Sequence, residues 1–424
     1  MEALKPLILY EQTTYDKSDA EDIQIFLRDH GVDLVGLPNE YMGEPQFLGV
    51  DSSLQAAYFI GASWLVKDKM PVVVRPKINE VDIAEMLIKA LSISSEEEAN
   101  YFSKCYKISF EEPNIATEEG KTQLTPLLVI HYITLLENVV KHGLKRDYIT
   151  ITENLTGKIK GHILFNQQLR QNIIPKREDR NACRYQVYTV DIPVNRLLKR
   201  ALIFADKMLQ VYMRNHNQYG NLRTRINKLV NAFTGVSDDI EISQVKNMSS
   251  NKLFRHYVVA IQVAKEILRR YDYSLSNVSA ETHLTPPFWI DMARLFEMYV
   301  LYLLRQTYGE SIEFQVPGTY QTPDYVHKTE NMILDAKYKT IYGGSFQPKK
   351  MIPDIREISG NARDVAIRKH LENWEDEPEC VIIYPASDGL LSFDGPLSEI
   401  AHKKPITEFH KFYKIPIRLP VQGE

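Results

Sequence analysis

The stretch TPDYVHKTENMILDAKYKT, residues 322–340, decides how the C-terminal part of this chain folds. Two short apolar runs flank a polar centre, which predicts a β-hairpin with its turn at Thr329–Glu330. The second run carries Asp335 and Lys337 in an otherwise apolar strand. Buried charges are costly unless they are paired or bind a metal. The stretch therefore holds either an ion pair or a group of residues that does chemistry.

The predicted register brings acidic side chains together. His327 is opposite Met332, and Asp324 is opposite Asp335. Directly opposed residues of an antiparallel pair have Cβ atoms about 4.5–5.5 Å apart, so two carboxylates there repel unless a cation lies between them. Asp335 and Lys337 leave the strand on the same face. His327 is expected on the opposite face from Asp324, where a structural role is favoured.

A helix predicted over residues 291–309 supplies a third acid. At about 100° per residue, Glu297 lies within about 20° of Leu304 in projection. Leu304 belongs to the apolar stripe of this helix, so Glu297 flanks the buried side and not the solvent side.

These residue types suit phosphodiester hydrolysis. We expect Asp324, Asp335 and the Ala336 carbonyl to bind Mg²⁺, or Mn²⁺, with Glu297 binding directly or through water. Such an ion polarises a phosphodiester and lowers the pKa of a bound water. Lys337 would orient or deprotonate that water, or stabilise the charge that develops on the phosphate. The pattern is loose, however, and an Asp–Lys ion pair on an edge strand is the alternative.

The rest of the chain predicts a multidomain α+β protein. Strand signals dominate the first 80 residues, where AAYFIGASWLV and PVVVRPKI flank a turn. Helical periodicity dominates residues 193–273, and the prolines of THLTPPFW mark a boundary. We expect a β-rich N-terminal domain over residues 1–120, a mainly helical middle region over 121–281 and a C-terminal α/β domain over 282–424.

Composition narrows the class of protein. Three widely spaced cysteines give no disulfide or zinc framework and favour a reducing, cytoplasmic location. No apolar stretch is long enough for a transmembrane helix, so no membrane partner is expected. The motif G-x-x-x-x-G-K-[ST] is absent from the sequence, so we expect this chain to bind no nucleotide.

The net charge of −4 means that any DNA contact must come from local basic groups. Lys349 and Lys350 follow the hairpin closely and are the best candidates. Arg356 and Arg363 fall two turns apart on the next predicted helix, where one face would present both to the DNA backbone.

Several stretches resemble the McrC family, the nuclease subunits of McrBC-type, modification-dependent restriction systems. The similarity runs in order from about residue 60 to 365. It is carried by PVVVRPKI (71–78), LTGKIKGHI (155–163), CRYQVYTVDIPVNRLLKRAL (183–202), FWIDMARLFEMYV (288–300) and DAKYK (335–339).

The resemblance implies a C-terminal PD-(D/E)xK nuclease domain with a mixed sheet. Asp324, Asp335 and Lys337 would occupy the catalytic motif, and Glu297 would be the upstream helical acid. It also implies a partner, an AAA+ GTPase of the McrB type that recognises modified double-stranded DNA. The N-terminal domain would dock on the ring of that partner, and this subunit would stimulate its GTP hydrolysis.

Two features leave alternatives open. Glu357 and Asn361 occupy positions at which the family often carries a Q-x-x-x-Y-like helix, a departure that would alter DNA or metal contacts. Asn195 and Arg196 look functional by resemblance. Their chemistry favours a structural role, with Asn195 capping a helix and Arg196 paired with a nearby acid.

We therefore expect a Mg²⁺-dependent DNA endonuclease subunit that works with an AAA+ partner. One alternative is a regulatory protein that activates an AAA+ ring and carries a vestigial nuclease site. Another is a standalone nuclease of repair or phage defence, which would cut DNA without any partner.

Overall fold

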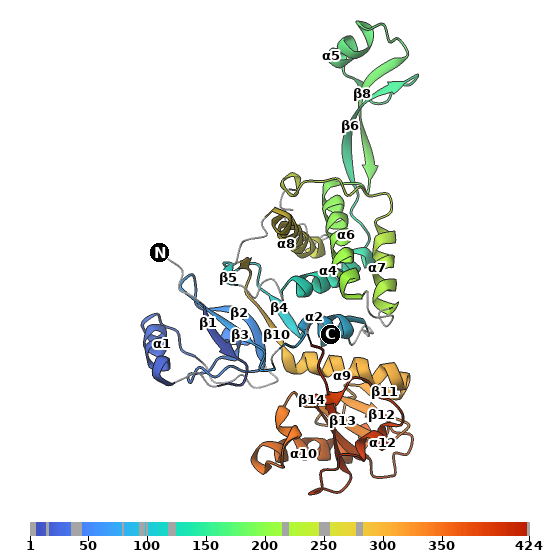
Figure 1. Ribbon diagram of the computed structural model, residues 1–424. Coiled ribbons are helices and arrows are strands. Elements are labelled where there is room, and N and C mark those ends of the chain that lie inside the picture. Colours follow the sequence, from blue (N-terminus) through green and yellow to red (C-terminus); the bar gives the residue numbers. More distant parts are fainter. Residues whose placement is uncertain are drawn as a thin grey trace. The chain divides into compact units, whose positions relative to one another are not determined.

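The computed structural model describes residues 6–13, 17–34, 45–78, 80–92, 98, 101–117, 124–213, 220–245, 255–276 and 283–421. Contacts divide the chain into two compact units. One unit joins residues 1–127 to residues 280–424, and the other comprises residues 128–279. The two ends of the chain therefore fold together, and its middle forms a separate body (Figure 1).

The first sheet of the larger unit has five strands in the order β1-β3-β2-β10-β4. β2 (Phe59–Val66) and β3 (Met70–Arg75) form the hairpin that the sequence predicts, and β1 (Leu7–Tyr10) pairs in parallel with β3. β10 (Phe288–Asp291) lies between β2 and β4 (Tyr106–Ile108). A strand from the start of the predicted C-terminal domain thus completes the N-terminal sheet.

Gly61 permits β10 to pair closely with β2. Its φ of +139° is a conformation that side chains rarely adopt, and a Cβ at this position would lie 2.2 Å from the Phe288 carbonyl oxygen. Only a residue without a side chain fits between the two strands at this point.

The second sheet is mixed and has the order β11-β12-β13-β14-β15. β13 pairs antiparallel with β12 and parallel with β14, and β15 continues the parallel direction. The mixed sheet expected in the C-terminal region is therefore present. Its strands are β11 (Ile312–Phe314), β12 (Tyr325–His327), β13 (Met332–Ala336), β14 (Glu379–Leu390) and β15 (Phe412–Ile417).

Two helices frame this sheet. α9 (Met292–Tyr308) follows β10 directly and begins at Asp291, whose carboxylate accepts hydrogen bonds from the first-turn amides. α10 (Pro348–Arg363) buries Ile355 and Ile358 in the apolar core against the sheet. The other elements of this unit are α1 (Lys17–Asp29), α2 (Ile83–Ser92), β5 (Ile115–Thr117), β9 (His283–Thr285), α11 (Val365–Arg368) and α12 (Leu397–Ala401).

The smaller unit is a helical body with a projecting arm. Its helices are α4 (Leu124–Lys141), α6 (Pro193–Met213), α7 (Gly220–Ala232) and α8 (Arg255–Ser276). The long antiparallel strands β6 (Asp147–Thr156) and β8 (Arg180–Thr189) form the arm, joined by β7 (His162–Ile163), with α5 (Phe165–Gln168) near its outer end (Figure 1). None of the helices in the described ranges has the length and apolarity that a membrane crossing requires.

The substitution Gly61→Ala is expected to lower the free energy of unfolding by about 2–4 kcal/mol, because strained φ and a backbone clash coincide there. Gly31→Ala is the matched control, since Gly31 has a φ of +69° but open space around a Cβ. It should lower that free energy by only about 1 kcal/mol. Denaturant unfolding of both variants measures the difference, and equal effects would contradict a close approach at Gly61.

Candidate functional site

The hairpin register of the structure is the predicted one. Tyr325 pairs with Leu334, and His327 pairs with Met332. Continued by one residue, this register places Asp324 opposite Asp335. Both acids are buried, with 8% and 4% of their surface exposed. The turn chemistry of a short local segment is therefore enough to bring the two carboxylates to one end of the hairpin.

Asp324 is held by both of its carboxylate oxygens. Oδ2 accepts a hydrogen bond of 2.7 Å from the Ala336 amide, and Oδ1 accepts one of 3.2 Å from Gln315 Nε2. The carboxylate thus links the strand ends of β11, β12 and β13. Its position is fixed by backbone geometry and does not depend on a free rotamer.

The Asp–Lys ion pair exists, but it does not lie on an edge strand. Lys337 Nζ is 2.8 Å from Asp335 Oδ2 and 2.9 Å from Glu357 Oε2. Asp335 belongs to β13, which has a neighbour on each side. The edge-strand alternative is therefore wrong, because β14 pairs with β13 from a distant part of the chain. Glu357 reaches the site from α10.

Glu297 joins the same centre from α9. It is half-buried, as the projection of the helix predicts. Tyr101 donates a hydrogen bond from its hydroxyl to Glu297 Oε2. The Tyr325 hydroxyl donates to the Glu297 carbonyl at 2.6 Å and so ties α9 to the hairpin.

Burial and mutual repulsion set the protonation of this centre. Burial raises the pKa of Asp324 well above its usual range, and the charges of Glu297 and Asp335 raise it further. Burial also raises the pKa of Glu297 to about 8, although the hydrogen bond from Tyr101 opposes this shift. Burial alone would lower the pKa of Lys337, but the surrounding carboxylates of Asp335, Asp324 and Glu357 outweigh it and raise that pKa. Lys337 is therefore a protonated ammonium group at neutral pH.

The donor set suits a divalent cation held by two carboxylates. Across the described ranges, no three histidine, cysteine, aspartate or glutamate side chains lie close enough to hold a metal ion together. Mg²⁺ commonly takes only one or two protein carboxylates, with waters and phosphate oxygens completing its octahedron. Asp324 and Asp335 are buried acids that repel each other, and Lys337 Nζ contacts Asp335 Oδ2 at 2.8 Å. A divalent cation between the two acids would relieve their repulsion further.

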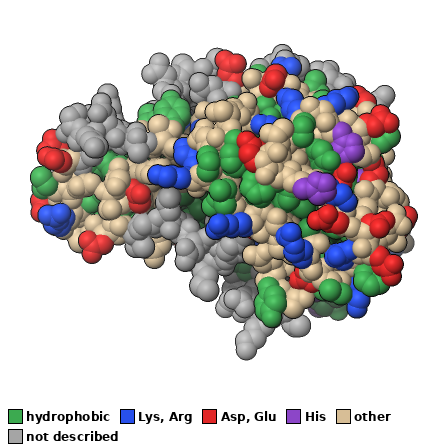
Figure 2. Space-filling view, turned by 90° about the horizontal axis from the view of Figure 1, so that it is seen from below, with side chains coloured by type: hydrophobic (Ala, Val, Ile, Leu, Met, Phe, Trp, Pro, Cys, Tyr) green, Lys and Arg blue, Asp and Glu red, His purple; other side chains and the backbone are tan. Residues whose placement is uncertain are grey.

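The expected DNA-contact residues lie outside this centre, on the surface of α10. Lys349, Lys350, Arg356 and Arg363 are all exposed. Lys349, Arg356 and Arg363 share one face of the helix. Figure 2 shows the molecule from below, where lysine and arginine side chains alternate with acidic and apolar ones.

Asn361 is not part of the centre either. It is buried, with 2% of its surface exposed. Of the two residues that depart from the Q-x-x-x-Y-like pattern, Glu357 is the one that contacts the candidate site, through Lys337.

Two residues of the centre, Tyr101 and Gln315, were not predicted. Gln315 lies just after β11, in an ordinary strand-like run. Tyr101 precedes Glu297 by 196 positions. No local pattern distinguishes either residue, because each is selected by where the folded chain places it.

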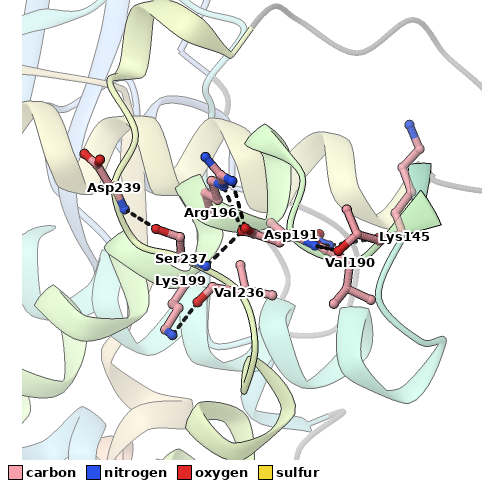
Figure 3. Close-up of polar contacts among 10 residues, drawn as sticks. Lys145, Val190, Asp191, Arg196, Lys199, Val236, Ser237 and Asp239 are labelled. Atoms are coloured by element: carbon pink, nitrogen blue, oxygen red, sulfur yellow. Dashed lines mark hydrogen bonds and ion pairs between the residues drawn. The ribbon is translucent and has the colours of Figure 1, made fainter. Parts of the chain in front are cut away.

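Arg196 has a structural role in the smaller unit (Figure 3), and so does Asn195. Arg196 forms a bidentate pair with Asp191, with both nitrogen–oxygen distances at 2.7 Å, as expected. The predicted cap is wrong, because Asn195 lies inside α6. Its amide nitrogen donates to the carbonyls of Lys145 and Val190 at 2.8 and 2.7 Å. These bonds join the base of the arm to the helical body.

The substitution Glu297→Gln is expected to stabilise the metal-free chain, and more strongly at pH 8 than at pH 5. The pKa of Glu297 is about 8 in the folded protein and 4.5 in the unfolded chain. The free energy of unfolding therefore falls as the pH rises from 4.5 through about 8. Glutamine does not titrate and keeps an acceptor for Tyr101. We expect a gain of about 2–3 kcal/mol at pH 8, measured by denaturant unfolding in EDTA.

The matched control is Glu310→Gln, which makes the same change at an exposed position next to the end of α9. It should leave the pH dependence of unfolding unchanged. A Glu297→Gln variant that is destabilised at pH 8 would show that Glu297 is ionised and held by a favourable partner.

Comparisons with known proteins agree with the resemblance found in the sequence. The model of the family described as "McrBC 5-methylcytosine restriction system component" matches residues 54–354. No curated protein matches the chain. Two solved structures from Thermococcus gammatolerans are similar in part. One is a half-complex from a tetradecameric assembly of McrB AAA+ hexamers with bound McrC, at 17% identity and a TM-score of 0.37, covering 99% of this chain and 95% of that one.

The other is the McrBC complex, at 16% identity and a TM-score of 0.30, covering 71% of this chain and 87% of that one. Neither superposition is close enough to support a conclusion. The family model, in contrast, spans most of the chain and includes β2, the middle unit, Glu297 and the whole hairpin. The chain belongs to the McrBC 5-methylcytosine restriction system component family.

Proposed function

We propose that this chain is the nuclease subunit of a restriction complex, a Mg²⁺-dependent DNA endonuclease with a PD-(D/E)xK domain in residues 282–424. One observation carries the proposal. Asp324, Asp335, Glu297 and Lys337 converge at the buried end of β13, where an ordinary core would have apolar residues. Membership in a restriction-system family supports the same function.

Each side chain has a distinct role in this proposal. Asp324, Asp335 and the Ala336 carbonyl would hold the ion, and Glu297, which does not lie with the two aspartates as a third direct ligand, would reach it through water. Asp324 also fixes the Ala336 amide, so the ligands are oriented before substrate arrives. When bound, Mg²⁺ supplies Lewis acidity toward the phosphodiester and lowers the pKa of water.

The pKa of Lys337, which the surrounding carboxylates raise in the metal-free centre, supports one of its expected roles. A lysine that stays protonated cannot accept a proton from water. It can donate hydrogen bonds to a phosphate oxygen and stabilise the negative charge that develops there. Lys337 is therefore proposed as an electrostatic stabiliser and not as the general base.

The proposed partner is an AAA+ GTPase of the McrB type, and the proposed substrate is modified double-stranded DNA. The family description names the McrBC system and 5-methylcytosine. The sequence lacks the P-loop motif that a GTPase of its own would require. The N-terminal domain is the proposed docking element, and this subunit would stimulate GTP hydrolysis by the ring.

In the presence of its AAA+ partner, GTP and Mg²⁺, the wild-type chain is expected to cut methylated DNA. Asp335→Asn should lower the cleavage rate about 10²-fold or more, because it removes one of two acids that face the ion. Asp388→Asn, at an exposed position of the same domain, is the matched control and should cut at the wild-type rate.

The same assay separates the two alternatives. A regulatory subunit would stimulate GTP hydrolysis in wild type and in Asp335→Asn, while neither protein cut DNA. A standalone nuclease would cut DNA without the partner.

Replacing Lys349, Lys350, Arg356 and Arg363 by glutamine is expected to weaken DNA binding without changing sequence preference. The slope of log affinity against log salt should become less steep by about 0.9 for each phosphate that is no longer neutralised. The exposed Lys403 and Lys404 provide a control pair on another part of the same unit. An unchanged slope in the fourfold variant would exclude this face of α10 from the DNA interface.

A further inference from the structure

The residue after Lys337 is anchored in the N-terminal sheet. Tyr338 is buried, and its hydroxyl donates a hydrogen bond of 2.8 Å to Glu11 Oε1. Its carbonyl accepts one of 2.8 Å from Lys77 Nζ, and its ring lies 3.9 Å from the same ammonium nitrogen. Backbone and side chain of Tyr338 are thus both fixed by residues from the first 80 positions.

Glu11 and Lys77 meet because of the sheet topology. β1 and β3 are parallel, so the C-terminal ends of both strands lie at the same end of the sheet. The backbone amide of Lys77 donates to Glu11 Oε1 at 3.0 Å, and its Nζ also donates to Gln12 Oε1 at 2.7 Å. Glu11 and Lys77, which follow β1 and β3 of the first sheet, therefore both contact Tyr338, which follows β13 of the second sheet.

This arrangement is costly for a purely structural contact. Glu11 has no exposed surface, and its Oε2 atom has no hydrogen-bond partner among the described residues. A buried carboxylate with an unpartnered oxygen is less stable than an apolar side chain of the same volume. The geometry that Glu11 and Lys77 impose on Tyr338 therefore explains their presence at this point better than a contribution to stability does.

A second N-terminal side chain reaches the same centre independently. Tyr101 donates its hydroxyl to Glu297 and packs edge-on against Phe314, with ring centroids 5.1 Å apart. The acid on α9 and the lysine after β13 are therefore both secured by the first 127 residues, within one compact unit.

We propose that Glu11 and Lys77 are positioning residues of the nuclease centre, which act through Tyr338 to hold Lys337 and the Ala336 carbonyl in working geometry. The inference rests on the proposed nuclease function and deepens it. A displacement of the β1–β3 edge would misplace Lys337 while leaving the carboxylates of the hairpin intact. The N-terminal sheet would thus be able to switch the centre without contacting DNA.

The decisive variant is Tyr338→Phe, which removes one hydroxyl and changes neither charge nor packing volume. With partner, GTP and Mg²⁺, its single-turnover cleavage rate should fall about 10-fold, with the KM for DNA and the stimulation of GTP hydrolysis unchanged. Glu11→Leu should show the same loss. Glu11→Gln keeps an acceptor for the Tyr338 hydroxyl and should retain most of the activity.

The matched control is Tyr342→Phe. Tyr342 is also buried, and its hydroxyl also donates to a carboxylate, Asp354 Oδ2, at 2.6 Å. This bond stays within the C-terminal part, so the cleavage rate of Tyr342→Phe should remain within about 2-fold of wild type.

A metal-free measurement tests the geometry directly. Acetic anhydride labelling in EDTA, read by mass spectrometry, compares the reactivity of Lys337 with that of the exposed Lys350 in the same molecule. Tyr338→Phe should raise the relative labelling of Lys337 about 3-fold or more, whereas Tyr342→Phe should leave it unchanged.

Wild-type rate and labelling in Tyr338→Phe would overturn the inference. So would a lower melting temperature with an unchanged cleavage rate, or a parallel loss of cleavage and GTPase stimulation, because either result describes a general structural role. A wild-type chain that cuts no DNA with its partner would overturn the proposed function and the inference together.

Discussion

The centre depends on one ammonium group that carboxylates surround. Lys337 Nζ lies within 2.9 Å of two carboxylates, and Asp324 and Glu297 are close enough for their charges to act on the same site. Isolated carboxylates in such an environment would cost several kcal/mol each. The fold tolerates them because they share the Lys337 ammonium group and because Asp324 accepts hydrogen bonds from the Ala336 amide and Gln315.

Such an arrangement is a poor way to stabilise a domain. Apolar residues at the end of β13 would pack more favourably than acids and a lysine, since the latter must be desolvated. The strand itself is otherwise apolar, and its neighbours fill the core with Ile333 and Ile382. Charged side chains are therefore confined to the one end of the strand where the hairpin, α9 and α10 meet, a pattern that is typical of functional sites.

The N-terminal part of the chain forms one compact unit with the C-terminal part that carries the centre. β10 inserts between β2 and β4 and continues directly into α9, so the helix that carries Glu297 starts from the first sheet. Tyr101 then contacts Glu297 on α9, and Glu11 contacts Tyr338 just after β13. The N-terminal and C-terminal parts are therefore not separate folding units, because strands from opposite ends of the chain pair in one sheet.

Features that depend on residues close together in the chain could be predicted before the structure was known. The hairpin register follows from turn chemistry and strand periodicity, the inward tilt of Glu297 from the helical repeat, and the pairing of Arg196 with a nearby acid from its sequence neighbours, although only the structure identifies Asp191 as that acid. Other features depend on contacts between distant parts of the chain: β13 is a central strand, Asn195 links the arm to the helices instead of capping α6, and Tyr101 and Glu11 contact Glu297 and Tyr338. The physical reason is distance along the chain. Tyr338 and Glu11 are 327 positions apart, so no local pattern encodes their contact, which forms only when both sheets have folded.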